Sequence, residues 1–225
     1  MNGTKLISVN VGLPRQVISH GKPVLTGIFK SPVAGRVLVR AVNLEGDRQA
    51  DLSVHGGPDK AVYAYPAEHY PYWRAQLPEM EISWGMFGEN FTVQGFQEAE
   101  VRIGDKLRIG SALFRVTQPR LPCYKLGIRF GRDDMVKRFM QSGRTGFYLR
   151  VLEEGDAGAG DGIEVVSAAR DTLSVADIAS LYNSPEDTNR DLLERAVLTE
   201  ELSESWRSYF QGRLSRIEES EETRS

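Results

Sequence analysis

The chain has 225 residues, of which 40% are hydrophobic and 26% are charged, and its formal net charge is −3. A chain of this length can bury a full core, and its charge balance argues against a general nucleic-acid-binding protein. The single cysteine excludes an internal disulfide and an iron–sulfur cluster held by this chain alone. Three histidines beside it do not favour a self-contained zinc site.

The expected location is the cytoplasm, without membrane binding. No apolar run reaches the roughly 20 residues that a membrane-spanning helix needs. The N-terminal stretch MNGTKLISVNVGLPRQ lacks the charged and then apolar layout of a signal peptide.

Residues 5–167 predict a β-rich region of short strands. Strand-like segments lie at 5–13, 15–19, 24–29, 36–42, 60–65, 90–93, 106–110, 112–118, 146–152 and 163–167. The HGKP stretch between the second and third segments predicts a hairpin turn. Many short strands at this spacing favour a barrel or a sandwich over a doubly wound sheet. The glycine-rich stretch 155–162 lacks the GxGxxG spacing and predicts a loop.

Two helical segments interrupt these strands. The first begins at Pro66, a residue that a helix start tolerates, and Pro71 limits or kinks it. The second carries Asp133 and Asp134 in its first turn and ends at Gly143.

The pattern changes after residue 167, so we expect a β-rich domain at 1–167 and a three-helix extension at 168–225. Ser174 and Asp177 form a capping pair at the start of the first of these helices. Two further segments, 189–197 and 200–219, have apolar residues at helical spacing. This extension is acidic: from Glu153 to the C-terminus there are eighteen Asp and Glu against seven Arg.

One loop, residues 43–65, holds residue types that packing does not require. Arg48, His55 and Lys60 surround the pair Gly56 and Gly57. Paired glycines let a backbone approach a ligand closely and present N–H groups to an anion. The alternative is a tight turn with an incidental histidine. A lipase-type oxyanion loop is rejected because the chain has no GxSxG motif.

A second and a third loop add candidates. Residues 84–93 place Asn90, an amide donor, just before a strand. The stretch QPRLPCYKL holds Cys123 between Arg120 and Lys125, in a loop that two prolines stiffen. Nearby cations favour the thiolate, which is both nucleophile and metal ligand. The competing interpretation is a small buried hydrophobe.

Five of these motifs together resemble the MOSC domain, the module named for the molybdenum cofactor sulfurase C-terminus. VHGGPDKAVYAY, FGENFTV, IGDKLRIG, VTQPRLPCYKL and GRTGFYLRVL occur in the order and approximate spacing of that family, over about residues 30–167. The three-helix tail resembles the extension of stand-alone bacterial members. The resemblance implies a MOSC-type β-barrel whose single cysteine ligates molybdenum in a pterin-based cofactor. It also implies reduction of N-hydroxylated compounds, such as N-hydroxylated purine bases, to amines.

The resemblance gives the candidate residues roles. Cys123 would be the molybdenum ligand, His55 would deliver a proton, and Asn90 would orient pterin or substrate. The cofactor's phosphate and pterin would lie near a set of cations and backbone N–H groups, and Arg144 would close the pocket. This cofactor-binding set comprises Arg48, Gly56, Gly57, Lys60, Asn90, Arg120, Lys125 and Arg144.

A reductase of this kind needs electrons from a separate reductase, for which the acidic C-terminal helices are a candidate docking surface.

Three other classes of function stay open. A carrier would hold a persulfide or the cofactor on Cys123 without catalysing reduction. A thiol hydrolase would use Cys123 with His55. The last class is a module that binds anionic metabolites through its basic segment, where eight Lys and Arg stand against two Asp between Arg120 and Arg150.

Overall fold

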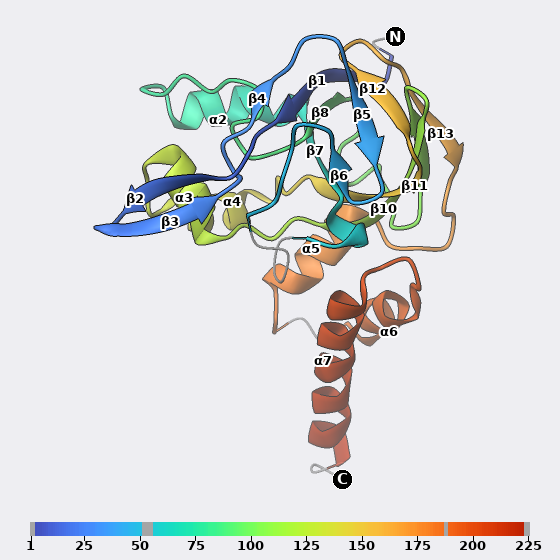
Figure 1. Cartoon of the computed structure of the whole chain (residues 1–225). Coiled ribbons are helices and arrows are strands. Elements are labelled where there is room, and N and C mark those ends of the chain that lie inside the picture. The colour runs from blue at the N-terminus through green and yellow to red at the C-terminus, as the bar shows by residue number, and fades with distance from the viewer. Residues whose placement is uncertain (1–2, 51–55, 187–188, 223–225) are drawn as a thin grey trace.

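The protein, described by a computed structural model over residues 3–50, 56–186 and 189–222, is built around one large sheet (Figure 1). Its eight strands lie in the order β13 (Ile163–Ser167), β9 (Lys106–Ile109), β10 (Ala112–Pro119), β11 (Phe147–Glu153), β7 (Val62–Pro66), β8 (Phe91–Gln94), β1 (Lys5–Val11) and β4 (Ser31–Pro32). Neighbours pair antiparallel except β7 and β8, which are parallel. The predicted mainly β fold is confirmed.

The sheet is not closed as a barrel, in contrast to the expected β-barrel. The strands β13 and β4 are its two edges and form no ladder with each other. Instead, the turn before β13 bonds to β1: Leu6 N donates to Asp161 O at 2.8 Å, and Gly160 N donates to Leu6 O at 2.8 Å. These bonds bring the two ends of the sheet together without a continuous ring of strands.

Two smaller ribbons flank the sheet. The predicted hairpin is confirmed as β2 (Arg15–Ser19) and β3 (Lys22–Thr26), joined through His20 and Gly21, both with positive φ as a two-residue turn requires. The other ribbon orders β12 (Gly155–Gly158), β5 (Arg36–Arg40) and β6 (Asn43–Leu44). The predicted loop 155–162 is therefore wrong in its first half. Gly155 is required there because a Cβ would lie 2.7 Å from Ala112 N.

Short helices lie between the strands in the chain: η1 (Pro58–Lys60), η2 (Ala67–His69), α2 (Tyr70–Gln76), α3 (Tyr124–Phe130) and α4 (Met135–Ser142). The helical segment predicted from Pro66 is confirmed: Pro66 ends β7 and is the N-cap of η2, and α2 follows directly at Tyr70. Pro71 lies in the first turn of α2, where a missing N–H is harmless. The α4 prediction is confirmed, with Asp134 as N-cap and Gly143 left-handed after it.

The C-terminal extension forms the three expected helices, α5 (Val175–Asn183), α6 (Arg190–Leu198) and α7 (Glu204–Glu222). Their apolar side chains belong to the same core as the sheet: Ile178, Leu193 and Phe210 cluster with Ile103 and Phe114. No helix among the described residues is both long enough and apolar enough to cross a membrane. A second core, rich in aromatic rings, lies under α2, α3 and α4.

Ser174→Ala is expected to lower the free energy of unfolding by about 1 kcal/mol. Ser174 Oγ accepts a bond from Asp177 N at 3.0 Å, and Asp177 Oδ2 accepts one from Ser174 N at 2.9 Å. Both bonds satisfy N–H groups at the start of α5. Urea denaturation measures the change. Ser180→Ala, exposed in the same helix, is the control and is expected to be neutral or slightly stabilising. Equal losses in both variants would contradict the capping role.

Candidate functional site

A cavity at the carboxyl end of β10 gathers six of the candidate residues. The predicted residues that line the cavity are Arg48, Lys60, Asn90, Arg120, Cys123 and Lys125. They come from separate segments between Arg48 and Lys125, and the fold brings them together. Tyr148 on β11 and Tyr63 on β7 add an aromatic wall, since their ring centroids lie 5.2 Å apart.

Cys123 lines the cavity and is the N-cap residue of α3. It is partly exposed, and its backbone is extended, with φ −116° and ψ 171°. Only residues 120–123 of the predicted loop lie outside helices and strands, because β10 ends at Pro119 and α3 begins at Tyr124. Cys123 thus occupies the boundary between an extended segment and a helix.

Arg120 is a buried cation with spare hydrogen-bonding capacity. It is 6% exposed, and its guanidinium carbon lies 4.8 Å from the Tyr63 ring centroid and 5.3 Å from that of Phe139. Its Nη1 has no hydrogen-bond partner among the described residues. Burial acts to lower the pKa of Arg120, but Tyr63, Tyr148 and Cys123 raise it above its ordinary value. A buried, unpaired guanidinium N–H in a cavity wall is a donor kept for an anionic ligand.

The cavity also holds an ion pair that sequence reasoning missed. Lys30 Nζ contacts Asp47 Oδ1, and their side chains are 8% and 1% exposed. Asp47 Oδ1 also accepts from Gly12 N at 3.0 Å, and its Oδ2 accepts from Asn90 Nδ2 at 2.9 Å. Burial lowers the pKa of Lys30, and the Asp47 carboxylate opposes that shift. Neither residue lies in a motif or in a pattern that distinguishes it from an ordinary surface charge.

The side-chain amide of Asn90 is hydrogen-bonded to other protein groups, which the sequence does not indicate. Its Oδ1 accepts from Tyr63 N at 3.1 Å, while its Nδ2 donates to Asp47 and to Asn10 O at 3.4 Å. The amide is therefore engaged by protein groups on both sides. Asn90 lines the cavity, and these bonds show that it positions Asp47 and the strand that carries Tyr63.

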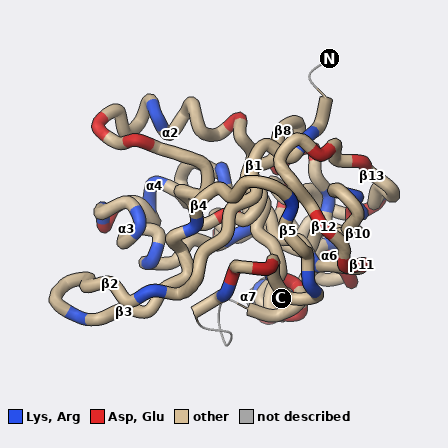
Figure 2. Tube along the Cα trace, turned by 45° about the horizontal axis from the view of Figure 1, so that its top comes forward, with Lys and Arg blue, Asp and Glu red and all other residues tan. Residues whose placement is uncertain are grey.

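The electrostatic balance of the cavity wall is strongly positive. Among the residues that the structure describes, five cations line it against one carboxylate, Asp47; the cations are Lys30, Arg48, Lys60, Arg120 and Lys125. Burial lowers the pKa of Lys60, with Asp59 acting in the opposite direction. Figure 2 shows further Lys and Arg along the β2–β3 hairpin and α3. Such a concentration of one sign in a concave site attracts anions.

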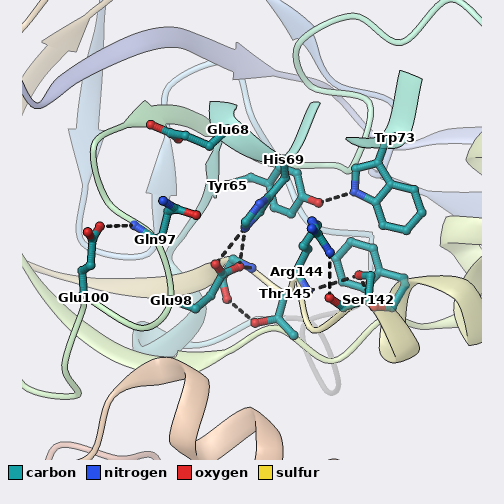
Figure 3. Close-up of polar contacts among 12 residues, drawn as sticks. Tyr65, Glu68, His69, Trp73, Gln97, Glu98, Glu100, Ser142, Arg144 and Thr145 are labelled. Carbon is teal, nitrogen blue, oxygen red and sulfur yellow. Dashed lines mark hydrogen bonds and ion pairs between the residues drawn. The ribbon is translucent and has the colours of Figure 1, made fainter. Parts of the chain in front are cut away.

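The remaining candidates lie elsewhere. Gly56 and Gly57 precede η1 and are not among the residues that line the cavity, although Gly57 has the positive φ of 96° that favours glycine. Arg144 stacks on Tyr72, with its guanidinium carbon 3.8 Å from the ring centroid, and its Nη1 donates to Ser142 O (Figure 3). His55 lies outside the described residues.

A buried His69–Glu98 pair ties the helical side of the molecule to β11. Figure 3 shows the two side chains pointing toward each other, and His69 Nε2 lies 2.8 Å from Glu98 Oε2. Glu98 Oε1 also accepts from Gly146 N at 2.7 Å. Next along the chain, Thr145 O accepts from Tyr63 OH at 2.8 Å. The pair supports the strand region behind the cavity and does not line the cavity itself.

Comparison with known families matches both parts of the chain. The family described as "MOSC domain" matches residues 51–164. The family described as "YiiM-like, 3-alpha helix domain" matches residues 173–216, the region of α5 to α7.

Individual proteins agree with these matches. "Uncharacterized protein YflK" of Bacillus subtilis (strain 168) is 44% identical over 212 residues, which cover 94% of this chain and 95% of that protein. The crystal structure of YiiM from Geobacillus stearothermophilus has a TM-score of 0.78 at 36% identity, covering 94% of this chain and 99% of that one. A protein called "Reductase" from Gibberella moniliformis is 35% identical over 161 residues, 70% of this chain but 28% of the relative.

Proposed function

The chain belongs to the MOSC family and carries the YiiM-like three-helix domain, and on this premise we propose that it binds the molybdenum cofactor and reduces N-hydroxylated compounds to amines. The observation that carries the proposal is the cavity, where one partly exposed thiol, Cys123, lies among five cations. MOSC domains are associated with the molybdenum cofactor, and the reductase-named relative supports an oxidoreductase.

The residues present fit an anionic cofactor that bears a soft metal. A thiolate suits molybdenum better than a carboxylate does, and Cys123 would be the protein ligand. The unpaired Nη1 of Arg120, together with Arg48, Lys60 and Lys125, would hold the phosphate and the pterin. Nearby cations also favour the thiolate form of a cysteine, which is the form that ligates a metal.

The aromatic wall is suited to a planar substrate. Tyr63 and Tyr148 present rings within the cavity, and aromatic side chains stack on heterocyclic bases. Burial raises the pKa of both phenols, with Arg120 opposing the shift, so the rings stay neutral at physiological pH. The neutral aromatic wall would contact an uncharged base such as an N-hydroxylated purine, while the cations would hold the anionic cofactor.

The cofactor, when bound, supplies the two-electron redox chemistry that breaks an N–O bond. The chain's own residues would bind the cofactor, orient the base and provide protons. The electrons would come from a separate reductase, because one cysteine cannot hold a cluster in this chain.

The direct test is turnover. Protein loaded with cofactor, with its molybdenum content measured, is mixed with a chemical reductant and an N-hydroxylated purine, and the amine is quantified by chromatography. We expect amine formation in proportion to bound molybdenum. Absence of turnover at a full molybdenum complement would overturn the proposed activity.

A further inference from the structure

The described part of the cavity wall holds a charged pair, Lys30 and Asp47, that anion binding does not explain. Asp47 neutralises the Lys30 ammonium, so the pair adds little to the positive potential. Burying an ion pair is costly, and well-packed apolar residues of similar size are often as stable. A pair that is costly to bury, held by two further groups and placed at the cavity wall points to chemistry.

We propose that Lys30 is the proton donor to the oxygen that leaves the substrate, and that Asp47 positions it; this inference rests on the proposed function. Lys30 and Asp47 both line the cavity that holds Cys123. Asp47 is itself held by Gly12 N and Asn90 Nδ2. The ammonium is therefore fixed in one place, as a proton donor has to be.

The step balances as follows. A substrate R–NH–OH takes up two electrons from the separate reductase and two protons, and gives R–NH2 and water. The N–O bond breaks, the oxygen receives one proton from the Lys30 ammonium, and the nitrogen receives the other from solvent. The neutral Lys30 amine regains its proton from solvent, and Asp47 remains a carboxylate throughout.

Several charged groups surround Lys30 and bear on its titration. Asp47 contacts its Nζ, and the Glu89 carboxylate raises its pKa from further away. Arg129 of α3 donates through Nη2 to the Lys30 carbonyl at 3.5 Å. The other ionisable side chains in the described part of the cavity wall are Arg48, Lys60, Tyr63, Arg120, Cys123, Lys125 and Tyr148. Burial is the largest influence and lowers the pKa of Lys30 below its ordinary value, toward the range where an amine can exchange protons during turnover.

Lys30→Arg separates proton donation from charge. Arginine keeps the cation and the pairing with Asp47 but does not lose its proton in proteins. We expect this variant to retain molybdenum at the wild-type level and to lose turnover by roughly 100-fold or more, the usual contribution of a general acid. Turnover within threefold of wild type would overturn the inference. Loss of molybdenum would also overturn it, since Lys30 would then hold the cofactor.

Asp47→Asn gives a second, independent signature. Turnover that needs protonated Lys30 falls as pH rises through the Lys30 pKa. Removing the carboxylate that raises this pKa moves the alkaline limb of the profile to lower pH. An unmoved limb would assign the pair a structural role only and contradict the proposal.

A measurement without the cofactor completes the test. In full-length protein labelled with ¹⁵N at lysine side chains, the Nζ resonance that disappears in Lys30→Arg identifies Lys30. We expect it to titrate below the other lysines, and lower still in Asp47→Asn. Titration of Lys30 with the exposed lysines would overturn the proposal. If wild type is fully loaded but inactive, the proposed function fails; if wild type turns over and Lys30→Arg does too, only the proton-donor assignment fails.

Discussion

Cys123→Ala protein, produced in a host that overproduces the molybdenum cofactor, is expected to carry at least about 100-fold less molybdenum than wild type. Loss of a residue that only supports a ligand already weakens metal binding by about 10- to 100-fold, and Cys123 is the proposed ligand itself. Elemental analysis of the purified proteins measures the difference. The cations of the cavity would remain, so a residual signal would report on cofactor held by charge alone.

A matched control removes a cation outside the cavity. Lys137 is exposed on α4 and is not among the cavity-lining residues, so Lys137→Ala is expected to carry wild-type molybdenum. Full molybdenum in Cys123→Ala would contradict the ligand role. Metal-free wild type under excess cofactor, with a labile sulfur adduct on Cys123 by mass spectrometry, would instead favour the carrier function.

Glu98→Ala is expected to lower the free energy of unfolding by about 3–5 kcal/mol. Glu98 and His69 have side chains 6% and 8% exposed, and Glu98 Oε1 also accepts from Gly146 N. The variant leaves His69 and a backbone N–H without their partner in a buried region. For a chain of this length the loss corresponds to a fall in melting temperature of roughly 6–20 °C, which calorimetry measures.

Glu100→Ala is the control for Glu98. Glu100 lies two residues further along, is exposed and accepts only from Gln97 N, at 3.2 Å, and Figure 3 shows it directed away from the pair. A loss below about 1 kcal/mol is expected. If Glu98→Ala is equally mild, the pair is not a supporting element of the strand region behind the cavity.

The local elements of this fold could be predicted where a short pattern determines them. Alternation found β1, β10 and β11, and the Ser174–Asp177 pair found the start of α5. Prediction failed where tertiary contacts override local preference. The α3 helix contains Gly127, a weak helix former, which is required because a Cβ there would lie 2.8 Å from Arg132 O. Strand β12 exists only because β5 pairs with it.

The candidate site was partly predictable for a similar reason. Arg120, Cys123 and Lys125 are close in sequence, so their proximity could be read directly. Lys30 and Asp47 are 17 residues apart and meet only after the sheet has formed. The aromatic wall likewise depends on the pairing of β7 with β11, in which Tyr63 faces Tyr148. No spacing rule in a single sequence encodes such contacts.

The dispersed origin of the cavity wall has a consequence for biosynthesis. Its residues run from Thr26 to Tyr148, and β11, which carries Tyr148, has to pair with both β7 and β10 before the wall is complete. A nascent chain therefore offers no preformed site, and under the proposed function the cofactor would bind only after folding. A ligand that binds only the folded state adds about 1.4 kcal/mol of stability for each tenfold excess over its Kd. Bound cofactor would therefore make correctly folded molecules more stable than misfolded molecules, which lack the complete cavity wall.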